Sequence, residues 1–149
     1  MKSALMLTAV LLAAASRAVV CQTITVAGNP AALTVSNAIA GSQPTAVTAP
    51  AVNYTITTPN PAGRTYKITA QLTSAMPAGV TLTATMTAPG GATTAGAVTL
   101  STTPSDMVTN IPRSTTFTGT ITYQVSATVS AGVVSATSRS VTLTIVQFP

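Results

Sequence analysis

The sequence contains no histidine and no tryptophan, and Asp106 is its one acidic residue. Acid–base catalysis, nucleophilic triads and metal centres depend on groups of such side chains placed together. The chain offers no carboxylate pair, no Ser/His/Asp set and no cluster of metal ligands. We therefore expect a protein that is not an enzyme and that needs no cofactor and no metal.

Charge and aromatic side chains are also scarce, at 5% and 3% of the residues. Beyond the first 21 residues the cations are scattered along the chain, at Arg64, Lys67, Arg113 and Arg139. Nucleic-acid binding requires clustered Lys and Arg, often with stacking aromatics, so we expect no nucleic-acid partner. Because 46% of the residues are hydrophobic, the low charge does not indicate disorder.

Cysteine occurs once, at Cys21, so the folded domain has no disulfide. Residues 1–21 have the features of a secretory signal-peptide helix, because Lys2 precedes an apolar run over 4–15 that is too short to span a membrane. We expect cleavage of this signal, export to the cell surface or medium, and no membrane attachment afterwards. A retained short anchor and lipidation of Cys21 are the alternatives. The full chain has 149 residues, a length typical of one domain, and we expect that domain to span 22–149.

Threonine supplies about a fifth of the chain, and ten prolines are spread through it. Threonine and valine favour strands, and proline interrupts helices. Outside the signal, apolar and hydroxylic residues alternate with a period of two, which is typical of half-buried strands. We expect an antiparallel β-sandwich of about seven to nine strands, at 22–27, 32–35, 52–57, 65–73, 80–88, 98–100, 106–111, 117–129 and 141–145.

The last two of these strands are predicted to form a hairpin around the turn Ser130-Ala131-Gly132. Tyr123 lies on the apolar face of the first strand, where we expect it to pack in the core and to bond its hydroxyl to nearby backbone. The segment from Tyr123 through Gly132 to the final Val-Thr-Leu-Thr-Ile resembles the end of bacterial immunoglobulin-like and fibronectin type III-like domains. That resemblance implies an immunoglobulin-like sandwich, here without the Trp and the cysteine pair of true immunoglobulin domains.

The small, threonine-rich exported domain also resembles bacterial pilin-type and spore-coat-type surface subunits. Such subunits complete one another's sandwich by adding a strand. The resemblance implies that the N-terminal segment 22–35 is the donor strand, although Gly28-Asn29-Pro30 interrupts it. Its pocket-filling side chains would be Ile24, Val26, Leu33 and Val35. The alternative is that these residues form the first two strands of their own sandwich.

Two function hypotheses follow. The first is a structural subunit that associates with itself into a surface filament or coat, because edge strands without Lys or Glu invite strand addition. The second is an adhesive module that binds glycan, protein or another component of the cell envelope. A filament subunit should leave a terminal strand unpaired in its own sandwich, whereas a binding module should pair every strand and expose an aromatic patch.

Two further features admit a special use beside an ordinary one. Lys67 with Asp106 or Asn110 has the residue types of an internal isopeptide crosslink, although a surface salt bridge also explains them. The threonine rows 81–87 and 116–122 space hydroxyls about 7 Å apart along a strand, as an ice-binding surface does. Threonine is also the usual residue of an exposed strand face.

Overall fold

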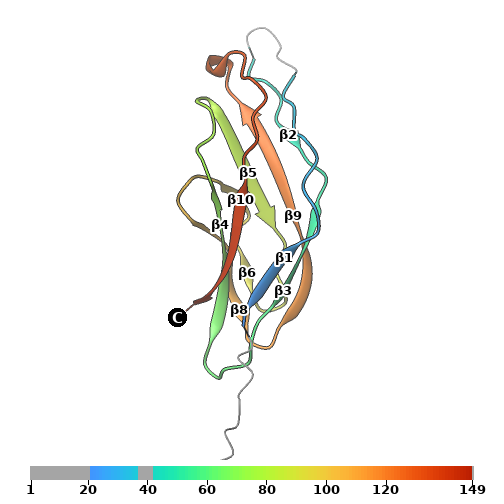
Figure 1. Ribbon diagram of the computed structural model, residues 1–149, viewed down its shortest axis with the longest axis vertical. Coiled ribbons are helices and arrows are strands. Elements are labelled where there is room, and N and C mark those ends of the chain that lie inside the picture. The colour runs from blue at the N-terminus through green and yellow to red at the C-terminus, as the bar shows by residue number, and fades with distance from the viewer. Residues whose placement is uncertain (1–20, 37–41, 149) are drawn as a thin grey trace, which may run out of the picture.

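A computed structural model describes residues 21–36 and 42–148 (Figure 1). The expected signal peptide therefore lies outside the described residues, apart from Cys21. The described chain contains ten strands, one 3-10 turn at Val129–Ala131 and no α-helix. It contains no helix with the length and apolar character that a membrane crossing requires. The strands are β1 (Thr23–Val26), β2 (Val47–Thr48), β3 (Val52–Thr57), β4 (Thr65–Leu72), β5 (Val80–Met86), β6 (Thr93–Thr94), β7 (Ala97–Thr99), β8 (Ser105–Pro112), β9 (Thr116–Ala127) and β10 (Val141–Phe148).

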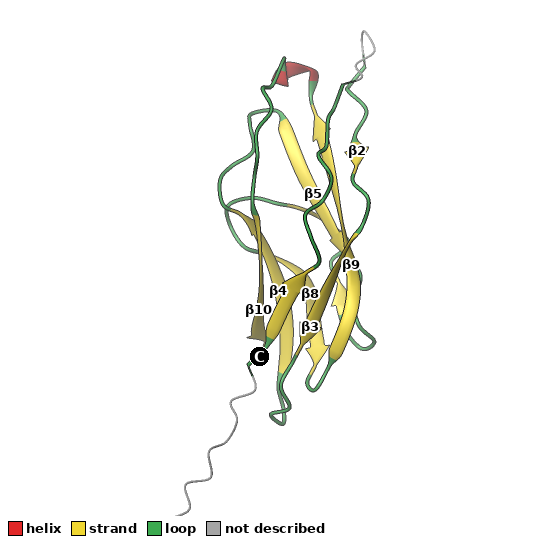
Figure 2. Cartoon of the chain, turned by 45° about the vertical axis from the view of Figure 1, so that its right-hand side comes forward, coloured by secondary structure: helices red, strands yellow, loops and turns green. Residues whose placement is uncertain are grey.

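The strands form two antiparallel sheets that face each other as a β-sandwich (Figures 1 and 2). The first sheet has the order β1-β3-β9-β5-β7, and β2 pairs with the far half of β9. The second sheet has the order β10-β4-β8-β6. The all-β prediction is confirmed, and β1 and β10 each end a sheet with one hydrogen-bonded neighbour.

Alternating side chains build the core between the sheets, as the period of two predicted. Along β4 the residues Tyr66, Ile68, Ala70 and Leu72 are buried, and every residue between them keeps solvent contact. The bulged register between β4 and β8 lets the successive residues Met107 and Val108 both face inward. The fully buried large side chains are Tyr54, Ile56, Ile68, Met86, Met107, Val108, Ile111 and Ile121.

The predicted terminal hairpin is wrong, because β9 and β10 lie in different sheets. β9 pairs with β3 and β2 on one side and with β5 on the other, so neither side is free for β10. β10 pairs with β4 instead, from Val141 opposite Leu72 to Phe148 opposite Thr65. The connection over 128–140 is much longer than a hairpin loop of about 2–5 residues, which gives the chain room to change sheets. In immunoglobulin domains the last two strands share a sheet, so the edge topology here differs.

The predicted strand 32–35 is also absent. These residues run extended but have no ladder partner, and the pairing of this part of the chain stops after Val26. Gly28 has a φ of +88°, in the left-handed region that favours glycine, and Pro30 has no N–H to donate. The alternation at 32–35 therefore gives two half-buried side chains, Leu33 and Val35, without sheet hydrogen bonds.

Candidate functional site: sheet edges and the threonine face

The N-terminal candidate residues lie along one edge of the sandwich. Ile24 on β1 is half-buried and packs on the core, whereas Val26, at the end of the same strand, is 41% exposed. Leu33 also packs on the core, and Val35 is half-buried. β1 is paired with β3 over four residue pairs, from Thr23 opposite Thr57 to Val26 opposite Tyr54. The first half of the predicted donor segment is thus a short edge strand of its own chain.

The residues that follow, 29–36, contain the second half of that segment and are called the arm below. It makes no backbone hydrogen bond to any described residue; the last such bonds before it come from the N–H groups of Ala27 and Gly28. Its side chains alternate, because Leu33 and Val35 are half-buried while Ala32 and Thr34 are exposed. The arm is therefore attached to the sandwich mainly through apolar side chains, a weak mode of attachment for an extended backbone.

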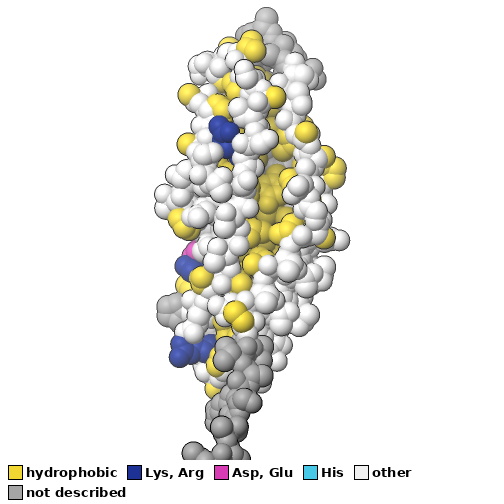
Figure 3. All heavy atoms as spheres, in the orientation of Figure 1, with side chains coloured by type: hydrophobic (Ala, Val, Ile, Leu, Met, Phe, Trp, Pro, Cys, Tyr) yellow, Lys and Arg dark blue, Asp and Glu magenta, His cyan; other side chains and the backbone are white. Residues whose placement is uncertain are grey.

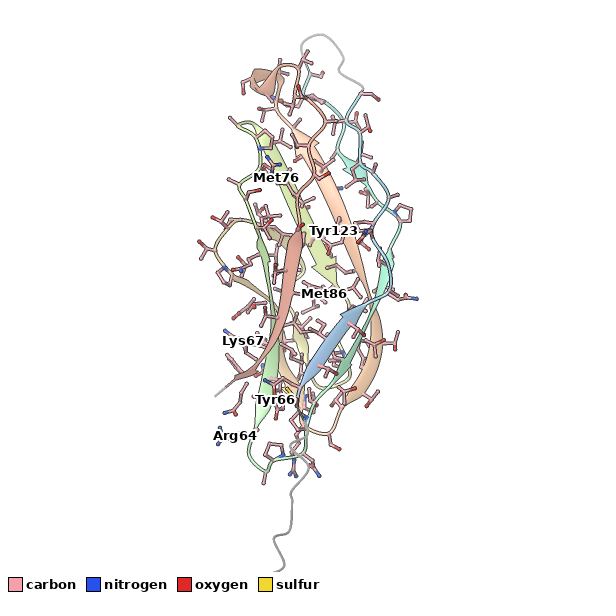
Figure 4. The ribbon with its side chains drawn as sticks, viewed as in Figure 1. Arg64, Tyr66, Lys67, Met76, Met86 and Tyr123 are labelled. Carbon is pink, nitrogen blue, oxygen red and sulfur yellow. The ribbon has the colours of Figure 1, made fainter. Side chains whose placement is uncertain are left out.

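β10 forms the second long edge, and it lies near β1 without pairing to it. Its sequence, VTLTIVQF, has eight residues with no charge, no proline and no glycine. Proteins usually protect a sheet edge from strand addition with charged residues, proline or β-bulges, and the sequence of β10 has no charged residue and no proline. Figure 3 shows a strip of apolar side chains at the surface between β10 and the arm. Tyr123 and Met86, which Figure 4 draws between these two segments, are only 6% and 1% exposed and belong to the core. Large exposed apolar patches often mark interaction sites on otherwise soluble domains.

The outer face of the first sheet carries hydroxyls and no charge. The two predicted threonine rows are adjacent, because Thr85 on β5 lies opposite Thr122 on β9. They continue onto β3 and β1, where Thr118 lies opposite Thr55 and Thr55 opposite Thr25. A shallow depression of about 430 Å³ in this face is lined by Thr48, Thr83, Thr85, Ala97, Thr122 and Gln124. Its lining can offer only neutral hydrogen bonds and methyl contacts to a ligand.

Lys67 and Asp106, the isopeptide candidates, form an ion pair across β4 and β8 with a Nζ–Oδ1 distance of 2.9 Å. Both side chains keep solvent contact, and the Lys67 ammonium lies 5.4 Å from the centre of the Phe148 ring. Asn110 is exposed, with a φ of +56°. The described residues contain no group of three His, Cys, Asp or Glu side chains that could hold a metal ion.

The aromatic side chains form no exposed patch among the described residues. Tyr54, Tyr66 and Tyr123 are buried, and Phe117 and Phe148 are half-buried. The Tyr123 hydroxyl makes no hydrogen bond to a described residue, although we expected it to bond to nearby backbone. Burial raises the pKa of this hydroxyl.

The tyrosine-to-backbone bond belongs to Tyr54 instead, which sequence reasoning did not single out. Its hydroxyl donates to the Thr87 carbonyl, and its ring meets Phe117 edge-on with centroids 6.1 Å apart. Burial raises the pKa of Tyr54 to about 12, against a smaller lowering effect of Thr87. Tyr54 lies opposite Gly119 on β9, and this cross-strand pair leaves room for the ring.

The chain matches no model of a known protein family, and neither the curated proteins nor the solved structures include a significant match.

Proposed function

We propose that the protein is a non-catalytic, exported structural subunit that associates with copies of itself through strand addition, as in a surface filament or coat. The observation that carries the proposal is the pair of unprotected sheet edges, β1 with its arm and β10, beside an exposed apolar strip. No Lys, Arg, Asp or Glu lies on β1, on the arm or on β10, so the segments themselves carry no charge that assembly would desolvate.

The donor in this proposal is the N-terminal segment 22–35, with Ile24, Val26, Leu33 and Val35 as its contact residues. Since β1 pairs within its own chain, donation takes the form of an exchange, in which β1 leaves its own β3 for that of the next copy. Exchange of an identical element restores the contacts it breaks, so its free-energy cost is small. A head-to-tail exchange that does not close into a ring produces a filament.

The immunoglobulin-like relationship is proposed in a modified form. The pairs β4–β8 and β9–β5 correspond to the inner pairs of the two immunoglobulin sheets. The strands beside these inner pairs are exchanged relative to an immunoglobulin domain. The last strand, β10, lies beside β4, and the early strand β3 lies beside β9. Both termini therefore supply edge strands, which favours assembly through terminal segments.

An adhesive module is the second candidate, and the depression in the threonine face favours it. Six uncharged residues line this depression, which suits a neutral hydroxylated ligand such as a glycan. Binding sites of this kind usually include aromatic side chains for stacking, and the aromatic residues here lie in or against the core. We therefore rank this candidate below strand-mediated assembly.

The test is size-exclusion chromatography with negative-stain electron microscopy on residues 22–149 and on a variant lacking 22–35. Strand exchange predicts large ordered oligomers or filaments for the first protein and monomers for the second. Circular dichroism of the shortened protein serves as the folding control. A first protein that stays monomeric at high concentration would refute self-assembly, and glycan and envelope binding would then be measured instead.

A further inference from the structure

No described strand pairs with the outer side of β10, and the burial of its side chains reflects this. Val141 and Leu143 face the core but are only half-buried, whereas their partners on β4, Leu72 and Ala70, are 2% and 0% exposed. The two sides of one ladder thus differ because β4 is covered by β8 and β10 has nothing hydrogen-bonded beyond it. One more strand beside β10 would cover Val141 and Leu143 and pair the free backbone groups of the edge.

The arm has the length and the pattern that such a strand needs. Residues 29–36 match the eight residues of β10, and the arm places Ala31, Leu33 and Val35 at two-residue intervals. The inward residues of β10, namely Val141, Leu143 and Ile145, have the same spacing. Neither segment carries a charge, and the backbone of the arm has no hydrogen-bonded partner among the described residues.

The arm of the same copy is held away from β10 by its connection. Only residues 37–41 separate it from the segment that leads into β2, and β2 pairs with β9 in the other sheet, with Val47 opposite Val125. Figure 1 shows the arm and the segment before β3 running beside each other on that side. An arm whose β1 has been exchanged into another copy does not have this restraint, because its β2 stays paired in the sandwich that it left. Residues 37–46 then connect the two copies, and ten extended residues span up to about 33 Å.

We propose that β10 is the acceptor edge of the assembly and that the arm 29–36 of a second copy adds to it as a new strand. The inference rests on the proposed strand exchange, in which β1 of the second copy pairs with β3, and it specifies that the arm following this β1 binds along β10. In a centred register Leu33 of the donor lies opposite Leu143 of the acceptor for either strand direction, since each is the middle of three apolar residues spaced two apart. The acceptor site is therefore Val141, Leu143 and the exposed backbone edge of β10.

The experiment is disulfide trapping between two differently tagged proteins, each of residues 22–149 and each with one cysteine. One carries Leu33→Cys, and the other carries Leu143→Cys or, as the matched control, Thr142→Cys. Directly opposed residues have Cβ atoms about 4.5–5.5 Å apart, whereas Thr142 points to the other face of the sheet. Only contacts between copies produce the mixed heterodimer, so a contact within one chain does not contribute. Electron microscopy of the same samples records whether assembly occurs.

Strand addition to β10 predicts a severalfold excess of the Leu33→Cys/Leu143→Cys heterodimer over the Leu33→Cys/Thr142→Cys heterodimer. Ordered assemblies without that excess overturn the acceptor assignment and leave the proposed function standing. A wild-type protein that remains monomeric under all conditions overturns both. To separate a defect in folding from a lost contact, the thermal melting of each cysteine variant is compared with that of the wild type.

Discussion

Replacing Gly119 with alanine tests how the centre of the first sheet is built. A Cβ atom at this position would lie 2.6 Å from the Thr87 hydroxyl oxygen and 2.9 Å from a ring carbon of Tyr54, and it would also overlap the Phe117 ring. Thr87 and Tyr54 are both held in place by hydrogen bonds. The Tyr54 hydroxyl donates to the Thr87 carbonyl, and the Thr87 hydroxyl accepts from the Thr120 N–H at 2.8 Å. The added methyl group therefore has to displace a buried ring.

The expected cost follows from three contributions. Overpacking of a core costs about 1–3 kcal/mol, and a lost Tyr54 hydrogen bond adds about 1 kcal/mol. Alanine recovers about 0.5–1 kcal/mol because it loses less backbone entropy than glycine on folding. We expect Gly119→Ala to lower the free energy of unfolding by about 1–3 kcal/mol, or the melting temperature by roughly 4–12 °C for a domain of this size.

Urea denaturation and thermal melting followed by circular dichroism measure this change. Gly90→Ala is the matched control, because a Cβ atom there meets nothing within 4 Å, and we expect a change within about 0.5 kcal/mol. Tyr54→Phe should cost about 1 kcal/mol alone and less when combined with Gly119→Ala, since the two changes disrupt one contact. A Gly119→Ala protein that melts at or above the wild-type temperature would refute the packing argument.

Three further outcomes are expected. Because the pKa of Tyr54 is about 12 in the folded protein and 10.0 when unperturbed, the unfolded state loses its proton first as pH rises. The free energy of unfolding should therefore fall between pH 10 and 12 by up to about 2 kcal/mol, and Tyr54→Phe should flatten this slope in pH-dependent urea titrations. Asp106→Asn breaks a solvent-exposed ion pair and should cost at most about 1 kcal/mol in urea denaturation; a loss of several kcal/mol would contradict this. Thr144→Lys places a charge on the exposed face of the β10 edge and should reduce assembly in size-exclusion chromatography, whereas Thr85→Lys on the interior strand β5 should not; equal effects would argue against the edge.

Local alternation was sufficient to predict most strands and their inward faces. Tyr66, Ile68, Ala70 and Leu72 were expected inside from their spacing alone, and all four are buried. The same holds for Ile121, Tyr123 and Val125 on β9. The reason is physical, since a period of two places every second side chain on one face whatever the strand pairs with.

Pairing between distant segments could not be predicted in this way. Nothing within β10 indicates that it joins β4 rather than β9, because that choice depends on which edges of β9 are already occupied. The Tyr54–Gly119 pair was missed for a similar reason, since a glycine in a strand reads as a local weakness until its partner is known. Of the candidate donor residues, the structure keeps Ile24 and Leu33 against the core and leaves Val26 exposed, a difference that hydrophobicity alone does not encode.

The most direct test of strand-mediated assembly compares residues 22–149 with the double variant Leu33→Asp/Val35→Asp by negative-stain electron microscopy at matched concentrations. The variant leaves the β1 ladder intact and places two carboxylates where the arm contacts apolar surface, which carries a large desolvation cost. We predict ordered filaments or large oligomers from the wild-type sequence and monomers from the variant. Wild-type protein that remains monomeric, or a variant that assembles equally well, would contradict the proposal.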